Sequence, residues 1–215
     1  MPLPPRRRAL VMSHTNHKTC VAHCVWFWYP RWVHTTDRRV RRTRAALGQA
    51  LLDLAAERPF EGLTVRELVD RADVGYATFF RHYATKEALL LDVFGGIVGE
   101  LADLLQPTAE EGRLEEAGQQ LFDYVARHEA RLRLLFAAQR GTAVEREVRA
   151  AVEARILASR GFRPPTDVPA ALAAHHLAVA SLALVAWWLE HDMPHSPERM
   201  GQIYARLVVG PTRGR

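Results

Sequence analysis

The chain has 215 residues, 48% of them hydrophobic and 25% charged, an ordinary composition for a soluble globular protein of one or two domains. The net charge of +5 is unevenly placed: residues 1–44 hold ten Lys/Arg and one acid, whereas residues 45–215 hold 19 Lys/Arg and 23 Asp/Glu. Both cysteines, Cys20 and Cys24, lie near the start, which excludes a disulfide scaffold and fits a reducing compartment. The basic end indicates binding to nucleic acid or another polyanion, or a basic tail without a partner.

Residues 1–35 differ from the rest of the chain and are expected to be a disordered extension, or to precede the true start of the working protein. They contain several prolines and an aromatic cluster at residues 26–32, but no helical period. A metal site could be drawn from four side chains, but their spacing is not that of a zinc finger: His14, His17, Cys20 and Cys24. We therefore expect no metal and no cofactor, with a metal-responsive regulator as an alternative.

A helical period begins at residue 37. Apolar residues fall on one face of this segment: Val40, Leu47, Leu51 and Leu54. Arg58-Pro59 is expected to end the helix, because the residue before a proline disfavours helical backbone angles. Its first turns carry arginines at residues 38–44, from which we select Arg39 and Arg42 as contacts to a phosphate backbone. A solvated basic face is the alternative.

Two short helices with a turn between them follow, at residues 64–72 and 76–82. Thr64-x-x-Glu67 is a capping box, in which the threonine hydroxyl accepts from a free amide and the glutamate reaches back. With a turn through Val74-Gly75, the pair has helix-turn-helix proportions, in which the second helix enters the major groove of DNA. Phe79 and Tyr83, four residues apart, are expected to face the core.

The other side chains of the second helix are assigned to DNA. Those expected at base edges are Tyr76, Ala77, Thr78 and Arg81. Those expected along the phosphate backbone are Phe80, His82 and Lys86. For His82 and Lys86 the alternative is a solvated side chain at a helix end.

Every later segment is helical in pattern. A helix is expected from Lys86 to Pro107, followed by helices at residues 112–127, 129–139, 143–159, 167–190 and 197–209. No strand pattern appears, so the fold class is all-α. The longest apolar stretch, residues 168–189, is interpreted as a buried or interface helix and not as a membrane span, because it holds His175 and His176 at mid-length. The sequence has no G-x-S-x-G, phosphate-loop or H-E-x-x-H motif, so we expect no enzyme.

The run from Val74 to Leu89 resembles the helix-turn-helix of the TetR family of transcriptional repressors, and the resemblance covers about residues 38–94. It implies a DNA-binding domain at residues 36–84 and a helical effector-binding and dimerisation domain at residues 85–210. It also implies that Thr64, His82 and Lys86 hold phosphates and that Thr78 contacts a phosphate or a base. Two residues depart from the family pattern: Phe80 replaces a tyrosine, and Gly75, also counted as a DNA contact, replaces a serine.

The same resemblance implies a cytoplasmic homodimer that binds a palindromic operator in double-stranded DNA and is released by a small hydrophobic effector. Candidates for the effector pocket are Phe94, Tyr124, His128, Phe136, His175 and His176. Candidates for the dimer interface are Leu177, Leu184, Trp187, Trp188, Ile203 and Leu207. The alternative is a helical small-molecule-binding or interaction module whose DNA binding has weakened.

Overall fold

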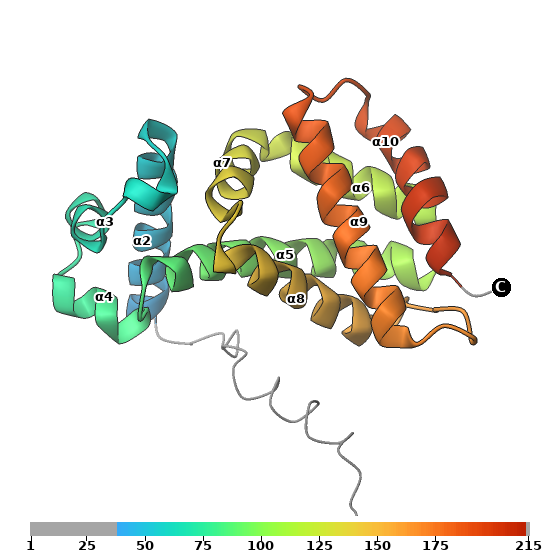
Figure 1. Ribbon diagram of the computed structural model, residues 1–215, viewed down its shortest axis with the longest axis horizontal. Coiled ribbons are helices and arrows are strands. Elements are labelled where there is room, and N and C mark those ends of the chain that lie inside the picture. Colours follow the sequence, from blue (N-terminus) through green and yellow to red (C-terminus); the bar gives the residue numbers. More distant parts are fainter. Residues whose placement is uncertain (1–37, 214–215) are drawn as a thin grey trace, which may run out of the picture. The chain divides into compact units, whose positions relative to one another are not determined.

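The structure is a computed structural model that describes residues 38–213. Its main helices are α2 (Arg38–Glu57), α3 (Val65–Ala72), α4 (Tyr76–His82), α5 (Lys86–Glu110), α6 (Leu114–Arg127), α7 (Glu129–Gln139), α8 (Ala143–Ala158), α9 (Ala170–Glu190) and α10 (Pro197–Tyr204) (Figure 1). No strand occurs between residues 38 and 213, so the all-α class is confirmed. The expected extension at residues 1–35 and the metal site drawn from His14, His17, Cys20 and Cys24 lie outside the described residues.

Helices α2, α3 and α4, which we call the three-helix unit, share one apolar core. The buried residues of this core are Leu47, Leu51, Leu54, Leu68, Val69, Phe79 and Tyr83. The capping box is confirmed: the Thr64 hydroxyl accepts from the Glu67 amide, and the Glu67 carboxylate accepts from the Thr64 amide. As expected, Phe79 and Tyr83 face inward, which leaves the other side chains of α4 for the surface.

The turn between α3 and α4 places its strained residue at Asp73, which adopts left-handed angles (φ 51°, ψ 47°). L-residues other than glycine adopt this conformation at a cost, although aspartate tolerates it better than most. Gly75, two residues later, has φ −61° and ψ 138°, angles that any residue can adopt. The glycine of this turn therefore does not occupy the position that most needs one.

We expect Asp73→Gly to raise the free energy of unfolding by about 1 kcal/mol, because glycine removes the steric cost of the left-handed conformation. Gly75→Ser is the matched variant. Its Cβ would lie 3.6 Å from Thr78 Oγ1, an ordinary contact, and a serine cap adds only a few tenths of a kcal/mol over glycine. Urea unfolding measures both changes. Destabilisation by Asp73→Gly would contradict this interpretation of the turn.

Helix α5 continues through Pro107 to Glu110, so the expectation that Pro107 ends the helix is wrong. Proline removes one backbone donor from a helix interior. The next turn holds nevertheless, because the buried Thr108 hydroxyl lies 3.0 Å from both the Leu105 carbonyl and Gln120 Oε1 of α6. The result is a single 25-residue helix that starts beside the three-helix unit and runs into the C-terminal helices.

The C-terminal helices pack closely because two glycines meet. A Cβ added at Gly118 of α6 would lie 2.8 Å from the carbonyl oxygen of Gly201 in α10, and one added at Gly201 would lie 2.5 Å from the Gln119 amide nitrogen. The backbones of α6 and α10 are therefore in direct contact, while α9 lies beside α8 (Figure 1). After Tyr204 the chain forms a π-helical turn, Ala205–Val209, before a last 3-10 turn, Gly210–Thr212.

By length and composition alone, α9 could cross a membrane, and it is the one such helix among the described residues. One side of it is buried in the protein: Ala173, Ala174, Leu177, Ala178, Val185, Trp188 and Leu189. Large apolar side chains also remain exposed on it: Leu172, Val179 and Trp187. The helix thus belongs to the core through one side and presents a second apolar side at the surface.

Candidate functional site

The exposed side of α4 carries an aromatic pair. Tyr76 is 50% exposed and Phe80, one turn later, is 48% exposed, and their ring centroids are 5.1 Å apart in an edge-to-face arrangement. Phe79 anchors the helix in the core and also contacts Phe80 edge-on, at 5.3 Å. The Tyr76 and Phe80 rings are therefore held in place while presenting apolar surface outward.

Polar groups share this side of α4. Arg81 is exposed beside the methyl group of Ala77, so both side chains are accessible to a partner. The Arg81 guanidinium donates to Thr78 Oγ1 at 2.7 Å, so the hydroxyl proton of Thr78 is left to donate elsewhere. Gly75 starts the helix without a side-chain cap. The face combines apolar rings with donors, a mixture suited to thymine methyl groups, bases and phosphates.

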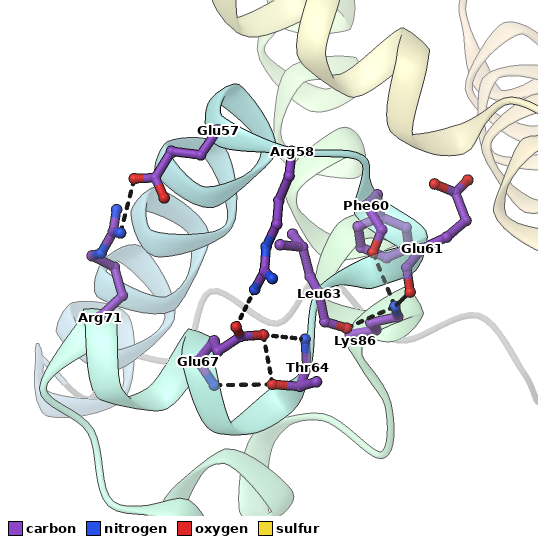
Figure 2. A network of polar contacts seen from close by, with 9 residues as sticks. All are labelled: Glu57, Arg58, Phe60, Glu61, Leu63, Thr64, Glu67, Arg71 and Lys86. Carbon is purple, nitrogen blue, oxygen red and sulfur yellow. Dashed lines mark hydrogen bonds and ion pairs between the residues drawn. The ribbon is translucent and has the colours of Figure 1, made fainter.

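Thr64 is engaged within the protein. Its amide and its hydroxyl both donate to Glu67 Oε2, at 2.9 and 2.7 Å, and Arg58 binds the same carboxylate through Oε1 (Figure 2). These contacts, that from Arg58 foremost, lower the pKa of Glu67 to about 2. Both donors with which Thr64 could bind a phosphate are thus used in the capping box.

Lys86 is also engaged within the protein, contrary to its expected position on a DNA phosphate. Its Nζ donates to the backbone carbonyl oxygens of Phe60, Glu61 and Leu63, at 2.8–2.9 Å, and lies 4.7 Å from the centroid of the Phe60 ring (Figure 2). An ammonium group has three donors, and all three are used. Lys86 therefore fastens the start of α5 to the turn between α2 and α3.

A second contact fastens α5 to the three-helix unit. Arg44 of α2 pairs with both carboxylate oxygens of Asp92, at 2.6 and 3.1 Å, and the Tyr83 hydroxyl donates to Asp92 Oδ2 at 2.5 Å. Burial, together with this bond, raises the pKa of Tyr83 well above its usual range. Arg44 is thus a structural residue, although it belongs to the arginine run that was expected to face phosphates.

The remaining arginines of that run stay exposed. Arg39 and Arg42, the two selected from the sequence, are exposed on α2. Arg41 is exposed too, and it precedes Arg44 by three residues, so it lies beside Arg44 on the helix surface. Because Arg44 contacts Tyr83 at the end of α4, Arg41 is a further phosphate candidate beside Arg39 and Arg42. The helical offset from Arg44 could have found it.

His82, at the end of α4, is partly buried next to Tyr83, with ring centroids 6.3 Å apart. Burial lowers the pKa of its imidazole, and the nearby cations Arg44 and Arg81 lower it further. Its imidazole is therefore mostly neutral at pH 7 in the free protein. A phosphate placed against the ring would favour the charged form and raise this pKa.

We expect DNA affinity to rise as the pH falls from about 8 to about 6, because binding a phosphate raises the pKa of His82 and so couples binding to proton uptake. Glutamine at position 82 keeps a hydrogen-bond donor but cannot titrate. The DNA affinity of His82→Gln should therefore rise less than that of the wild type as the pH falls. Fluorescence anisotropy with labelled DNA at constant salt measures both proteins. Identical pH profiles for wild type and His82→Gln would remove His82 from the phosphate contacts.

We expect Phe80→Tyr to tighten DNA binding by up to about tenfold, because a hydroxyl on this exposed ring adds a donor where the TetR pattern has one. Anisotropy titration with duplex DNA tests this expectation. Tyr76→Phe is the matched variant, because it removes a hydroxyl from the neighbouring exposed ring. Phe79→Tyr cannot serve as the control, because Phe79 is buried. If Phe80→Tyr leaves affinity unchanged, no phosphate lies within reach of that ring.

The C-terminal helices surround an open cavity of about 320 Å3. Its wall is mainly apolar and includes Phe94, Ile97 and Leu101 of α5, Leu121 and Val125 of α6, Leu132 and Phe136 of α7, and Ile156 of α8. Two of the six residues expected to line an effector pocket, Phe94 and Phe136, do line it, with ring centroids 5.9 Å apart. The same long helix α5 therefore carries cavity residues and both contacts to the three-helix unit.

The other four expected pocket residues are not in the cavity wall. The Tyr124 hydroxyl donates to Glu100 Oε2 at 2.5 Å, and its ring stacks on His128 with centroids 4.2 Å apart. His175 is exposed and pairs with Glu153 of α8 at 2.8 Å, and His176 is exposed beside it. Aromatic and histidine side chains serve in many environments, so their type alone could not identify the wall.

The expected dimer residues divide into two groups. Trp188 is buried within the chain, where it packs perpendicular to Phe122 and donates to the His195 carbonyl. Leu177 is buried and lines the cavity, so the side chains of both residues are used inside the chain. Leu184 and Ile203 are partly buried against the core. Trp187 is 41% exposed and Leu207 is 66% exposed. These last two residues keep the surface exposure that an interface requires.

Comparison with known proteins agrees with this architecture. Residues 49–93 match the sequence model of "Bacterial regulatory proteins, tetR family", and residues 113–210 match that of a "Transcriptional regulator C-terminal region". The HTH-type transcriptional regulator YxbF of Bacillus subtilis is 28% identical over 177 residues, which is 80% of this chain and 46% of YxbF. The chain spans less than half the length of the curated relatives it matches, YxbF included.

Solved structures share the fold. A TetR-family regulator from Shewanella sp. PV-4 superposes with a TM-score of 0.59 at 20% identity, over 80% of this chain and 99% of that chain. Thermus thermophilus FadR, a TetR-family repressor in complex with lauroyl-CoA, superposes with a TM-score of 0.56 at 21% identity, over 80% and 96%. The two sequence models together match more than half of the chain, so the protein belongs to the TetR family of transcriptional regulators.

Proposed function

We propose that this regulator is a repressor that binds a palindromic operator as a homodimer and releases it when a small, largely apolar effector enters the cavity. The observation that carries the proposal is that α5 lines the cavity with Phe94 and also holds the three-helix unit through Lys86 and Asp92. A ligand that displaces α5 would displace the DNA-binding helices with it.

The DNA part of the proposal is tested by selecting bound sequences from a random duplex pool with the full chain. A palindrome with half-sites about one helical turn apart, bound with strong salt dependence, is the expected result. The contacts proposed on the DNA side are Arg39, Arg41, Arg42, Tyr76, Ala77, Thr78, Phe80, Arg81 and His82. Failure to enrich any sequence at low salt would reject the proposal.

The effector part rests on the cavity. A cavity of this size with a mainly apolar wall is typical of sites that bind small molecules. Lauroyl-CoA in the structure of Thermus thermophilus FadR shows that a protein of similar fold binds a molecule with a long apolar part. We propose that this chain likewise takes a ligand with an apolar part. Phe136→Arg, which puts a charge into the wall, should abolish release without weakening DNA binding.

The dimer part rests on the exposed apolar side chains of α9 and of the π-helical turn: Leu172, Val179, Trp187 and Leu207. Exposed apolar residues gathered on neighbouring elements are typical of an interface. Light scattering should give twice the chain mass. Trp187→Glu should give the mass of the monomer. Its operator affinity should fall strongly, because the two half-sites are then bound by separate chains.

A second candidate function follows from a specific observation. Three groups expected on phosphates are unavailable for them: Lys86 and Thr64 are engaged within the protein, and Phe80 lacks a hydroxyl. This favours a helical small-molecule-binding module with weakened DNA binding. Ligand binding without any duplex binding at low salt would support this alternative over the repressor.

A further inference from the structure

Three arginines from separate segments line the cavity: Arg155 of α8, Arg163 of the connection between α8 and α9, and Arg213 after the last turn. We call them the arginine rim. Among the described residues that line the cavity, Asp103 is the one acidic side chain. Residues 45–215 hold more acids than bases, 23 against 19, so this concentration of positive charge is local.

The rim charges are held mainly by neutral groups. Arg155 binds Asp103 at 3.3 Å, but Arg163 donates to the carbonyls of Arg160 and Phe162, and Arg213 donates to the Gly112 carbonyl at 3.4 Å. Between residues 38 and 213, no ion pair involves Arg163 or Arg213. Carbonyl contacts orient a guanidinium without neutralising it, so two of the three rim charges remain uncompensated.

Arg213 is placed against the cavity by the shape of the backbone. The π-helical turn Ala205–Val209 precedes it, and Val209 and Thr212 line the cavity beside it. Gly112 has φ +76°, and a Cβ at that position would lie only 2.9 Å from the Arg213 guanidinium. The glycine therefore leaves the space that lets this arginine lie at the wall.

The volume of the cavity indicates how long an apolar chain it can bury. If each water-sized group takes roughly 30 Å3, a cavity of about 320 Å3 has room for on the order of ten carbon atoms. The polar groups in the wall include Ser181 and Tyr204, whose hydroxyls bond each other at 3.0 Å, with the Ser181 hydroxyl 2.6 Å from the Leu177 carbonyl. They offer little to a polar ligand deep in the cavity.

We infer that the effector is an anionic amphiphile whose apolar chain of about ten carbons fills the cavity and whose oxyanion head, a carboxylate or a phosphate, binds the arginine rim. The inference rests on the proposed effector site. Guanidinium groups bind both kinds of oxyanion through paired N–H donors. Arg155 and Arg163 are exposed, so a charged head bound to them would stay near water while the chain is buried.

The test is calorimetric titration of the full-length protein with decanoate, decyl phosphate, decanol and decylamine, each below its micelle concentration. We expect one of the two anions to bind at least about tenfold more tightly than decanol, and decylamine not to bind. Decanoate and decyl phosphate distinguish a carboxylate head from a phosphate head.

Arg163→Gln and Arg163→Gln/Arg213→Gln should remove the preference for the anion and leave decanol binding unchanged. Arg163 is exposed on a connection, so its single variant is expected to fold, and Arg160→Gln is the matched control because Arg160 is exposed outside the cavity wall. Equal affinity for anion and alcohol, or no effect of the rim variants, would overturn the inference. Release of operator DNA is measured in parallel. If decanol releases the DNA as readily as decanoate does, the proposed repressor function stands and the preference for an anionic effector is rejected. If the anion binds but the protein binds no DNA, the anionic effector stands and the repressor function is rejected.

Discussion

Replacing Lys86 with methionine is expected to lower the free energy of unfolding by about 2 kcal/mol and to weaken DNA binding without changing its salt dependence. The reason is that the ammonium binds three backbone carbonyls between α2 and α3, and methionine would leave them without these partners. The loss would loosen α3 and α4, so every DNA sequence should be bound more weakly. Urea unfolding and anisotropy titrations over a range of salt measure the two quantities.

Arg42→Ala is the contrasting variant. Arg42 is exposed, so stability should stay within about 0.5 kcal/mol, while the slope of log affinity against log salt should fall by about one unit if it contacts one phosphate. The opposite result would be a slope of log affinity against log salt that falls by about one for Lys86→Met, with an unchanged free energy of unfolding. That result would mean that Lys86 leaves the three carbonyls when DNA binds and contacts a phosphate.

Replacing Gly201 with alanine is expected to cost about 3 kcal/mol of stability and to disrupt effector binding. The new Cβ would lie 2.5 Å from the Gln119 amide nitrogen and 2.7 Å from the Glu115 carbonyl oxygen. Both are backbone atoms of α6, so α6 and α10 would have to separate. The cavity should change as well, because Leu121 of α6 and Tyr204 of α10 line it.

Gly96→Ala is the control for Gly201→Ala. Gly96 lies exposed in α5 with open space around its Cα, so alanine should stabilise the protein by about 0.5–1 kcal/mol through helix propensity alone. Urea unfolding should therefore give opposite signs for two chemically identical substitutions. Equal effects would mean that the contact between α6 and α10 is not as close as described.

Local features of this chain were readable from its sequence. The cap at Thr64, the inward Phe79 and Tyr83, and most helix bounds follow from neighbouring residues and from periodicity, which act within a few turns. Pro107 was the exception, since its helix is continued with the help of Gln120, a residue of the next helix. A signal confined to one segment cannot report such a partner.

The partners of charged and aromatic side chains were not readable in the same way. Lys86 fits the pattern of a phosphate contact, but its three carbonyls belong to a turn 23–26 residues earlier. The cavity wall draws on α5 to α10, and its largest group of residues is leucine, isoleucine and valine, which are the common residues of any helical core. Which apolar residues border a cavity depends on how the helices pack.

The continuous helix α5 has a consequence for anyone who would retune this protein as a biosensor. Phe94 borders the cavity and stands two residues after Asp92, which holds the three-helix unit. Substitutions there would alter ligand preference and the background signal in the absence of ligand together. Phe136 borders the same cavity from α7. Libraries aimed at new ligands should therefore begin on α7 and leave α5 as it is.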